Sequence, residues 1–426
     1  MKQPASLIPP ALQHRKFALL WGGLLVSITG SQMQMAALLW HLRTLSDQPV
    51  VVSGIGLVRF LPILLLAPFA GVIADTHNRR HIMFITQTVM AGTAAMLGYL
   101  TWTGAIQIWH IYLLSGLQAA AISFDLPARQ SLVPNLVPRN ILPSAYSLQS
   151  IASSVGSILG PALSGVVIGH LGQFAVYWMN TASFMAVLLA LLLMSTVEQG
   201  LRPALGGIKA SFEAIAEGAR FILSKPIIYS TMVLDFIATF FSSANTLLPF
   251  VARDLLNVDA VGYGWLAAGQ AIGSVGAGLV LAGRKDIRRQ GAIILAAVIL
   301  FGLATVLLGL SQWYMLAMAA LILIGGSDTV SSILRNTIRQ LNTPDNVRGR
   351  MVSINQVFFT GGPQLGEIRA GLAAQAFGPV YAIVAGGIAT VIGVILVAAR
   401  WPILRTYNGD EHDAPQPAAA AASPAD

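Results

Sequence analysis

The sequence predicts an all-α membrane protein, with twelve transmembrane helices arranged as two six-helix bundles related by pseudo-symmetry. Of its 426 residues, 55% are hydrophobic and only 10% are charged, whereas an ordinary soluble domain has about 25% charged residues. The apolar residues also gather in long stretches that lack the alternation of a barrel strand. Because backbone amides in lipid must form hydrogen bonds within their own segment, we expect helices.

Each apolar stretch is near the roughly 20 residues that a helix needs to cross about 30 Å of hydrocarbon. The expected spans are 17–42, 50–74, 82–104, 109–127, 144–169, 173–197, 227–251, 261–283, 291–311, 313–334, 351–377 and 380–399. The longest internal loop, 198–226, separates six spans from six. We therefore expect an N-terminal bundle over 1–197 and a C-terminal bundle over 227–400.

Two segments outside the spans have their own patterns. The loop 198–226 is predicted to hold an amphipathic helix on the inner leaflet. Its apolar residues recur at helical spacing, at Ile208, Phe212, Ile215, Ala219 and Ile222. The segment 401–426 ends in a stretch rich in Ala and Pro, which predicts a disordered tail.

The net charge of +8 is interpreted as a topology signal. Lys and Arg in the loops fall almost entirely on one side, where Arg335 and Arg339 are also expected, and only Arg43 and Arg253 fall on the other. Because positive charge stays inside, both termini are predicted to be cytoplasmic. No fold or motif supports a nucleic-acid partner.

Enzymatic alternatives have little support in the sequence. There is no cysteine, which removes thiol chemistry and disulfides, and no phosphate-binding loop for ATP. The seven histidines have no metal-binding spacing. We therefore expect no enzyme, cofactor or metal. The alternative function is a lipid or lysolipid flippase-type membrane protein, which should carry His, Asp and Ser groups clustered near one leaflet; no such cluster is found.

The two halves share a residue pattern. A shift of 206 positions aligns Arg129, Pro138, Asn140, Ser147, Gly160 and Gly165 with Arg335, Pro344, Asn346, Ser353, Gly366 and Gly371. The matches keep their order within equivalent loop and helix units, which favours an internal duplication. Two parallel repeats with a site between them at mid-membrane are typical of transporters that alternate between two open states.

Between spans 2 and 3, the run Gly71-Val-Ile-Ala-Asp75-Thr-His-Asn-Arg79-Arg80 resembles the cytoplasmic signature of the major facilitator superfamily. The resemblance covers essentially the whole chain. It implies that Asp75 faces the positive N-terminus of helix 11 and latches the halves together on the cytoplasmic side when the protein faces outward. It further implies that Arg79 pairs with an acid at the inner end of helix 4, where Asp125 stands.

In helix 5, the run Gly156-Ser-Ile-Leu-Gly160-Pro161-Ala-Leu-Ser-Gly165 is similar to the signature of the exporters of this superfamily. Glycines at this spacing make a flat packing seam, and Pro161 bends the helix there. The resemblance implies packing against helix 8, although an ordinary small-residue seam would show the same glycines.

The overall pattern, including Asp235 and the run Gly366-Glu367-Ile-Arg369-Ala-Gly371, is similar to the bacterial branch of siderophore exporters and macrolide efflux proteins. One position departs from many proton-coupled drug exporters. They carry Arg three residues before the Gln of helix 4, where this chain has Ser115 before Gln118. Proton coupling is therefore not implied by the resemblance alone.

Ionisable residues at membrane depth are the candidate working groups, since each charge costs about 2.5 to 3.5 kcal/mol to insert and needs a cavity or a partner. Arg59 and Glu367 both lie about 24 Å above the inner surface, which predicts an ion pair between the halves that breaks when the outer gate opens. Asp235 and Asp328 are candidates for proton coupling. Capping of a helix break remains open for both, with Gly325 and Gly326 beside Asp328.

Polar and aromatic side chains within the spans are candidates for a substrate cavity. They are Gln32, Gln34, Gln149, Phe241, Asn245, Gln270, Gln356 and Phe359. Amides bind varied substrates and aromatic rings add apolar contact, although each residue has helix packing as its alternative role. A cavity with few fixed charges suits a large amphipathic molecule.

These patterns together predict a monomeric secondary transporter of the bacterial inner membrane. It would export an amphipathic small molecule, drug-like or siderophore-like, by alternating access and in exchange for protons. Its expected partners are that small molecule, protons and the lipid bilayer.

Overall fold

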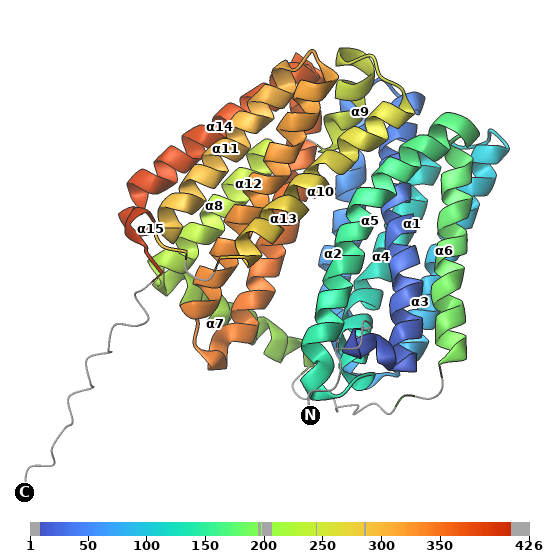
Figure 1. Cartoon of the computed structure of the whole chain (residues 1–426), viewed down its shortest axis with the longest axis horizontal. Helices are drawn as coiled ribbons and strands as arrows, with labels where there is room; N and C mark the ends of the chain where they lie inside the picture. Colours follow the sequence, from blue (N-terminus) through green and yellow to red (C-terminus); the bar gives the residue numbers. More distant parts are fainter. Residues whose placement is uncertain (1–8, 195–196, 198–206, 244, 285–286, 410–426) are drawn as a thin grey trace, which may run out of the picture.

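The computed structural model describes residues 9–194, 197, 207–243, 245–284 and 287–409. Figure 1 shows two groups of long helices side by side, one formed by the first half of the chain and the other by the second. No strand occurs in the described residues. An all-α membrane protein is therefore confirmed.

The N-terminal bundle holds six long helices. They are α1 (Arg15–Leu45), α2 (Pro49–Thr76), α3 (Arg79–Trp102), α4 (Ile108–Leu132), α5 (Leu142–Leu171) and α6 (Gln173–Leu193). Asn78 caps α3 by accepting hydrogen bonds from the backbone amides of Arg80 and His81. Short 3-10 turns lie at Pro10–Gln13, Val133–Asn135 and Arg139–Ile141.

The C-terminal bundle begins with an interrupted helix. Its members are α8 (Pro226–Ser242), α9 (Leu248–Phe250), α10 (Ala260–Ala282), α11 (Gln290–Leu310), α12 (Tyr314–Leu341), α13 (Asp345–Phe377), α14 (Pro379–Arg400) and the short α15 (Pro402–Thr406). The expected span 227–251 breaks after Ser242 and resumes with a 3-10 turn at Asn245–Leu247, α9 and a π-turn at Val251–Leu255. The linker helix α7 (Gly207–Ser224) lies at the same end of the molecule as the start of α1 (Figure 1).

Twelve expected spans correspond to these long helices, with α8 to the π-turn counted as one. Ten segments of the described chain are long and apolar enough to cross a membrane. The other two expected spans are α1 and α13, helices of 31 and 33 residues. Large apolar side chains are exposed on the outer faces, as at Leu65, Leu192, Leu279 and Leu396. Such faces suit lipid.

We call the end that holds α7 the inner end and the opposite end the outer end, following the charge-based prediction. The two bundles meet at the outer end. There, Tyr263 of α10 stacks on Trp40 of α1, with 5.0 Å between ring centroids. The Arg43 Nη2 atom lies 2.8 Å from Asp254 Oδ1, which joins α1 to the π-turn.

Candidate functional site

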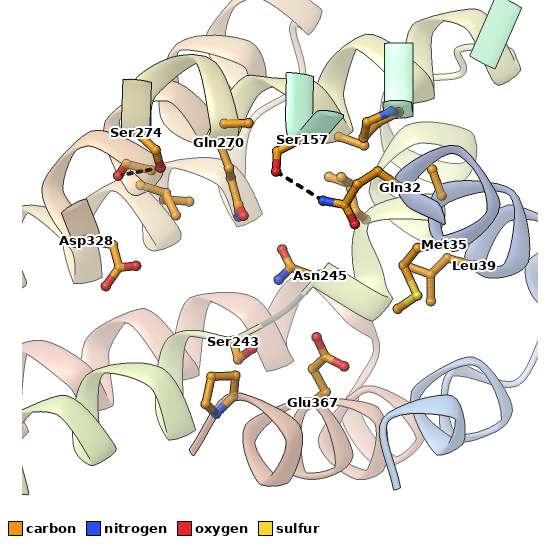
Figure 2. Close-up of a pocket in the computed structure, with 18 of the residues that line it drawn as sticks. Gln32, Met35, Leu39, Ser157, Ser243, Asn245, Gln270, Ser274, Asp328 and Glu367 are labelled. Carbon is orange, nitrogen blue, oxygen red and sulfur yellow. Dashed lines mark hydrogen bonds between the residues drawn. The ribbon is translucent and has the colours of Figure 1, made fainter. Parts of the chain in front are cut away.

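A cavity of about 510 Å³ lies between the two bundles. Helices α1 and α5 contribute to it from one side, and α8 to α13 contribute from the other. Figure 2 shows side chains from both bundles pointing into the same space, with Asn245 between Gln270 and Glu367. Its polar lining includes Gln32, Ser157, Ser243, Asn245, Gln270, Ser274, Asp328 and Glu367.

Three of the predicted amides line this cavity: Gln32, Asn245 and Gln270. Gln34 lies elsewhere, inside the N-terminal bundle, where it is buried. Its Nε2 atom donates to Gln118 at 3.0 Å, and its Oε1 atom accepts from Asn180 at 2.6 Å. Gln34 therefore joins helices of one bundle. Residues of α1 point in different directions around the helix, so Gln32 faces the cavity while Gln34 faces the bundle interior.

The other predicted cavity residues also lie elsewhere. Gln149 lines a second cavity within the N-terminal bundle. The ring of Phe241 lies 5.8 Å from the Arg369 guanidinium carbon, and Phe359 is 48% exposed without lining the cavity. The side chain of Gln356 lies outside the described part of the chain.

Glu367 is buried at the border of the cavity although it carries an acid group. Asn245 lines the cavity beside it (Figure 2), and Arg59 attracts it across the interface between the bundles. A Cβ atom at Gly56, one turn from Arg59, would lie 3.1 Å from Glu367 Oε2. Within the described residues the two charges form no salt bridge within 4.0 Å, and their role as a gate stays a prediction.

Asp235 lies outside the cavity, in a buried charge cluster. Its two carboxylate oxygens lie 2.9 Å from Arg335 Nη2 and 3.3 Å from Arg339 Nη2. The placement of Arg335 and Arg339 in a loop is wrong, since their side chains are 1% and 2% exposed. Helix α12 continues past the expected end at 334, and a spacing of four residues puts both guanidinium groups on one face.

Asp328 lies on α12 between this cluster and the cavity. Its carboxylate lies 3.9 Å from Arg335 and its side chain is 44% exposed, and it lines the cavity directly. Of the two proton-coupling candidates, Asp328 alone borders the space that a substrate would occupy.

Arg369 stabilises the break in α8, a role that the sequence analysis did not assign. Its Nε and Nη2 atoms donate to the carbonyls of Phe240 at 3.2 Å and Phe241 at 2.6 Å. These carbonyls belong to the last turn of α8, where no further helix supplies a donor. A Cβ atom at Gly366 would lie 2.6 Å from the Phe240 carbonyl oxygen, so α13 can approach the broken end closely. In the sequence, the feature that could have indicated this role was a charged residue at membrane depth between two glycines, Gly366 and Gly371.

Two residues of the cytoplasmic signature lie in open surroundings at the inner end. Asp75 is exposed, and a Cβ atom at Gly71 would meet no described atom within 4 Å. No described residue of another helix therefore packs closely against Gly71 in this conformation.

The basic residues of the signature contact backbone oxygens. Arg79 donates to the Ala74 and Ser131 carbonyls at 3.1 and 2.9 Å, and Arg80 donates to the Leu191 carbonyl at 2.8 Å. These bonds hold the start of α3 against α2, α4 and α6.

Asp125 accepts hydrogen bonds from Thr86 and Gln87 of α3, both at 3.0 Å. Its carboxylate is thus bonded to neutral groups on the neighbouring helix. Pairing of Asp125 with Arg79 stays a prediction.

The glycines of α5 face two different helices. Cβ atoms at Gly156 and Gly160 would meet α1, at 2.7 Å from Ile28 Cγ2 and 2.5 Å from Gln32 Cβ. Gly165 instead faces α10, the eighth span, where its Cβ would lie 2.9 Å from the Gly264 Cα, and a Cβ at Gly169 would lie 2.9 Å from Val261 Cγ2 of the same helix. The expected seam with helix 8 therefore leaves out Gly156 and Gly160, and it includes the Pro161 carbonyl, which would lie 2.6 Å from a Cβ at Gly264.

Comparison with known proteins agrees with this architecture. A family model described as a transmembrane secretion effector matches residues 5–420. The multidrug efflux pump Tap of Mycolicibacterium fortuitum is 24% identical, over 82% of this chain and 87% of its own. The enterobactin exporter EntS of Shigella boydii serotype 18 is 25% identical, over 77% and 78%. Macrolide efflux protein A of Streptococcus pyogenes is 23% identical, over 69% and 73%.

Two solved structures show the same fold. A bacterial homologue of the human lysosomal transporter Spinster, inward-facing and unoccupied, has a TM-score of 0.72 and 15% identity, covering 93% of this chain and 98% of its own. The nucleoside transporter NupG has a TM-score of 0.68 and 14% identity, covering 92% and 99%.

The protein is therefore a membrane transporter of the major facilitator superfamily, not an enzyme. Within that superfamily the chain belongs to the transmembrane secretion effector family and is an efflux-type transporter. The resemblance to the branch of siderophore exporters and macrolide efflux proteins is confirmed.

Proposed function

We propose that this transporter exports an amphipathic small molecule across the bacterial inner membrane by alternating access, in exchange for protons. The observation that carries the proposal is the cavity between the bundles, lined by both halves and bordered by Asp328 and Glu367. Its volume of about 510 Å³ lies in the range of small-molecule sites. Serine and amide side chains beside Met35, Leu39 and Tyr263 suit a cargo with polar and apolar parts.

The conformation supports an inward-facing state of this cycle. The bundles are joined at the outer end through Arg43 and Asp254 and through Gly165 and Gly264. At the inner end, the surroundings of Gly71 are open. A cargo that enters from the cytoplasm would meet this state. We further propose that both termini lie on the cytoplasmic side and that the protein acts as a monomer.

Proton exchange is supported by the two carboxylates that border the cavity. Ionisable residues at membrane depth that face a cavity mark ion and proton pathways in transporters. Asp328 and Glu367 lie on α12 and α13, and both line the space that the cargo would occupy. A proton and a cargo could thus compete for the same carboxylate.

The test uses everted membrane vesicles with an imposed proton gradient and a panel of amphipathic compounds. We expect a substrate to collapse the gradient in the wild type, and Asp328→Asn and Glu367→Gln to abolish this response. Asp259→Asn is the matched control, because Asp259 is exposed outside both cavities and an Asn there can still accept the hydrogen bond of the Gly262 amide that caps α10. Wild-type proton release by a variant that carries both cavity substitutions would refute the coupling.

A further inference from the structure

A second cavity of about 610 Å³ lies within the N-terminal bundle. It is lined by α1, α3, α4, α5 and α6, and therefore needs no residue of the other bundle. Gln32 and Ser153 line both cavities, so the second cavity adjoins the first. Arg129 and Tyr146 line it near the inner ends of α4 and α5, on the side where a cytoplasmic cargo would arrive.

Two residues that line this cavity each carry a buried polar atom with no hydrogen-bond partner among the described residues: Gln87 through Oε1 and Gln149 through Nε2. Gln87 is 2% exposed, and its Nε2 atom is occupied with Asp125 at 3.0 Å. A buried donor or acceptor without a partner is unfavourable, and its presence calls for a ligand or a water. The lining residues thus hold one unpaired acceptor and one unpaired donor.

A positive charge without an acid partner stands in the same cavity. Arg129 forms no salt bridge within 4.0 Å in the described part of the chain, although Asp125 precedes it by one helical turn. Asp125 also lines the cavity, but its Oδ1 atom accepts hydrogen bonds from Thr86 and Gln87.

The repeat in the other half shows what is missing. The counterpart of Arg129 under the shift of 206 is Arg335, which is paired with Asp235 and Asp328. The position that corresponds to Asp328 in α4 is Ile122, since 328 − 206 = 122. The N-terminal bundle therefore keeps the arginine and lacks this acid.

The remaining walls are mostly apolar, with Trp21, Met90 and Phe184 among them. The indole N–H of Trp21 is already bonded to the Leu148 carbonyl at 2.8 Å, so this ring offers the cavity its apolar surface. A guanidinium group binds a carboxylate through two N–H donors. A ligand that fits would combine an anionic group with an apolar body.

We propose that the second cavity is a binding subsite for an amphipathic organic acid. Arg129 and the Gln149 amide would hold its carboxylate, and Gln87 Oε1 would accept a hydroxyl or amide N–H of the same molecule. The proposal rests on the proposed export function, because the subsite adjoins the transport cavity at Gln32 and would hold the acid before it moves there.

The test measures binding of a fluorescent fatty acid, dansylaminoundecanoic acid, to the full-length protein in nanodiscs of zwitterionic lipid. The probe's primary amide, which has the same body without the charge, is the comparison ligand. We expect the wild type to prefer the acid by about tenfold, since a hydrogen bond to a charged group contributes that much or more. Arg129→Gln should remove this preference and leave binding of the amide unchanged.

Two further variants separate charge from structure. Arg129→Lys should keep part of the preference for the acid, because it keeps the positive charge, and Gln149→Met should weaken acid binding with Arg129 intact. The control is Arg139→Gln, which removes an exposed positive charge outside both cavities and should change neither ligand.

An unchanged preference for the acid in Arg129→Gln would overturn the subsite. Displacement of the probe by anionic phospholipid in the nanodisc would also overturn it, and would indicate a lipid site. The proton-release assay on Arg129→Gln with an uncharged substrate separates this outcome from the main proposal. Normal release there, with no acid binding in any variant, would leave the export function standing and remove the subsite alone.

Discussion

Charged residues at the interface between the bundles have different roles, and the role of each one follows from its contacts in the structure. Arg369 is an example. Its guanidinium is bonded to the Phe240 and Phe241 carbonyls at the end of α8. Glu367 lies two residues earlier on the same helix and borders the cavity with Asn245. Arg369 thus holds the chain on one side of the break after α8. Asn245 lies on the other side of this break and lines the cavity together with Glu367.

Arg369→Gln should lower thermal stability and weaken transport together, because two partly buried carbonyls at the end of α8 lose their donors, at a cost of up to about 1 to 3 kcal/mol each. The measurement is the melting temperature of the purified protein beside efflux of its substrate. Arg400→Gln is the control, since this exposed arginine lies 5.5 Å from the Trp401 ring. An unchanged melting temperature in Arg369→Gln would show that the break is held by other contacts.

Glu367→Gln should shift the population toward the outward-open state, because it leaves Arg59 without its attracting charge when the outer end is closed. The chain has no cysteine, so a single cysteine placed near the outer end of the seventh span reports accessibility without background labelling. A shift of about 1.4 kcal/mol changes the ratio of states tenfold.

The charge-swapped variant, Arg59→Glu with Glu367→Arg, should recover part of this change if the two groups act through each other. Equal labelling of the single and swapped variants would indicate that they act independently, and the gate would then be wrong.

At the scale of elements, matching glycines in the two halves make matching contacts. Gly160 of α5 faces α1 of its own bundle, and Gly366 of α13 faces α8 of its own. Gly165 meets α10 of the opposite bundle, and Gly371 meets α2, where its Cβ would lie 3.3 Å from the Pro49 carbonyl oxygen. On each of the two helices, one glycine thus packs within its own bundle and the other packs across the interface.

Gly165→Ala and Gly160→Ala should therefore have different effects. The first adds a methyl group against backbone of α10, so the outer end opens and cysteine labelling there increases. The second presses on α1 and should lower stability with little change in the ratio of states. Gly92→Ala is the control, because its Cβ would meet nothing within 4 Å. Equal labelling of all three variants would contradict this division of the seam.

At the scale of the whole molecule, the predicted cytoplasmic latch at Asp75 and the observed outer contacts are expected in opposite states. The outer end is closed here through Arg43 and Asp254, whereas Asp75 is exposed at the inner end. A group that makes its contact in one state only biases the equilibrium toward that state.

Asp75→Asn should largely abolish transport and leave insertion and expression intact, because the change removes a charge at a helix end that contributes little to packing. It should also reduce labelling of the outer cysteine, since the outward-facing state loses its latch. Asp259→Asn, which removes an exposed charge and keeps the cap of α10, is the control. Normal turnover in Asp75→Asn would show that the latch does not operate in this chain.

The sequence alone determined the membrane class, the all-α architecture and the family, because lipid requires long apolar helices and because Gly71 to Arg80 and Gly156 to Gly165 are local motifs. It also indicated that Asp328 and Glu367 were candidates, since a charge in an apolar run is visible without a structure. Tertiary structure decided which face of each helix meets which neighbour. Arg335 and Arg339 became a buried cluster with Asp235, and Gln34 joined the bundle interior while Gln32 faced the cavity. These assignments depend on helix rotation and on where a helix breaks, which contacts between distant segments fix and which hydrophobicity along the chain does not record.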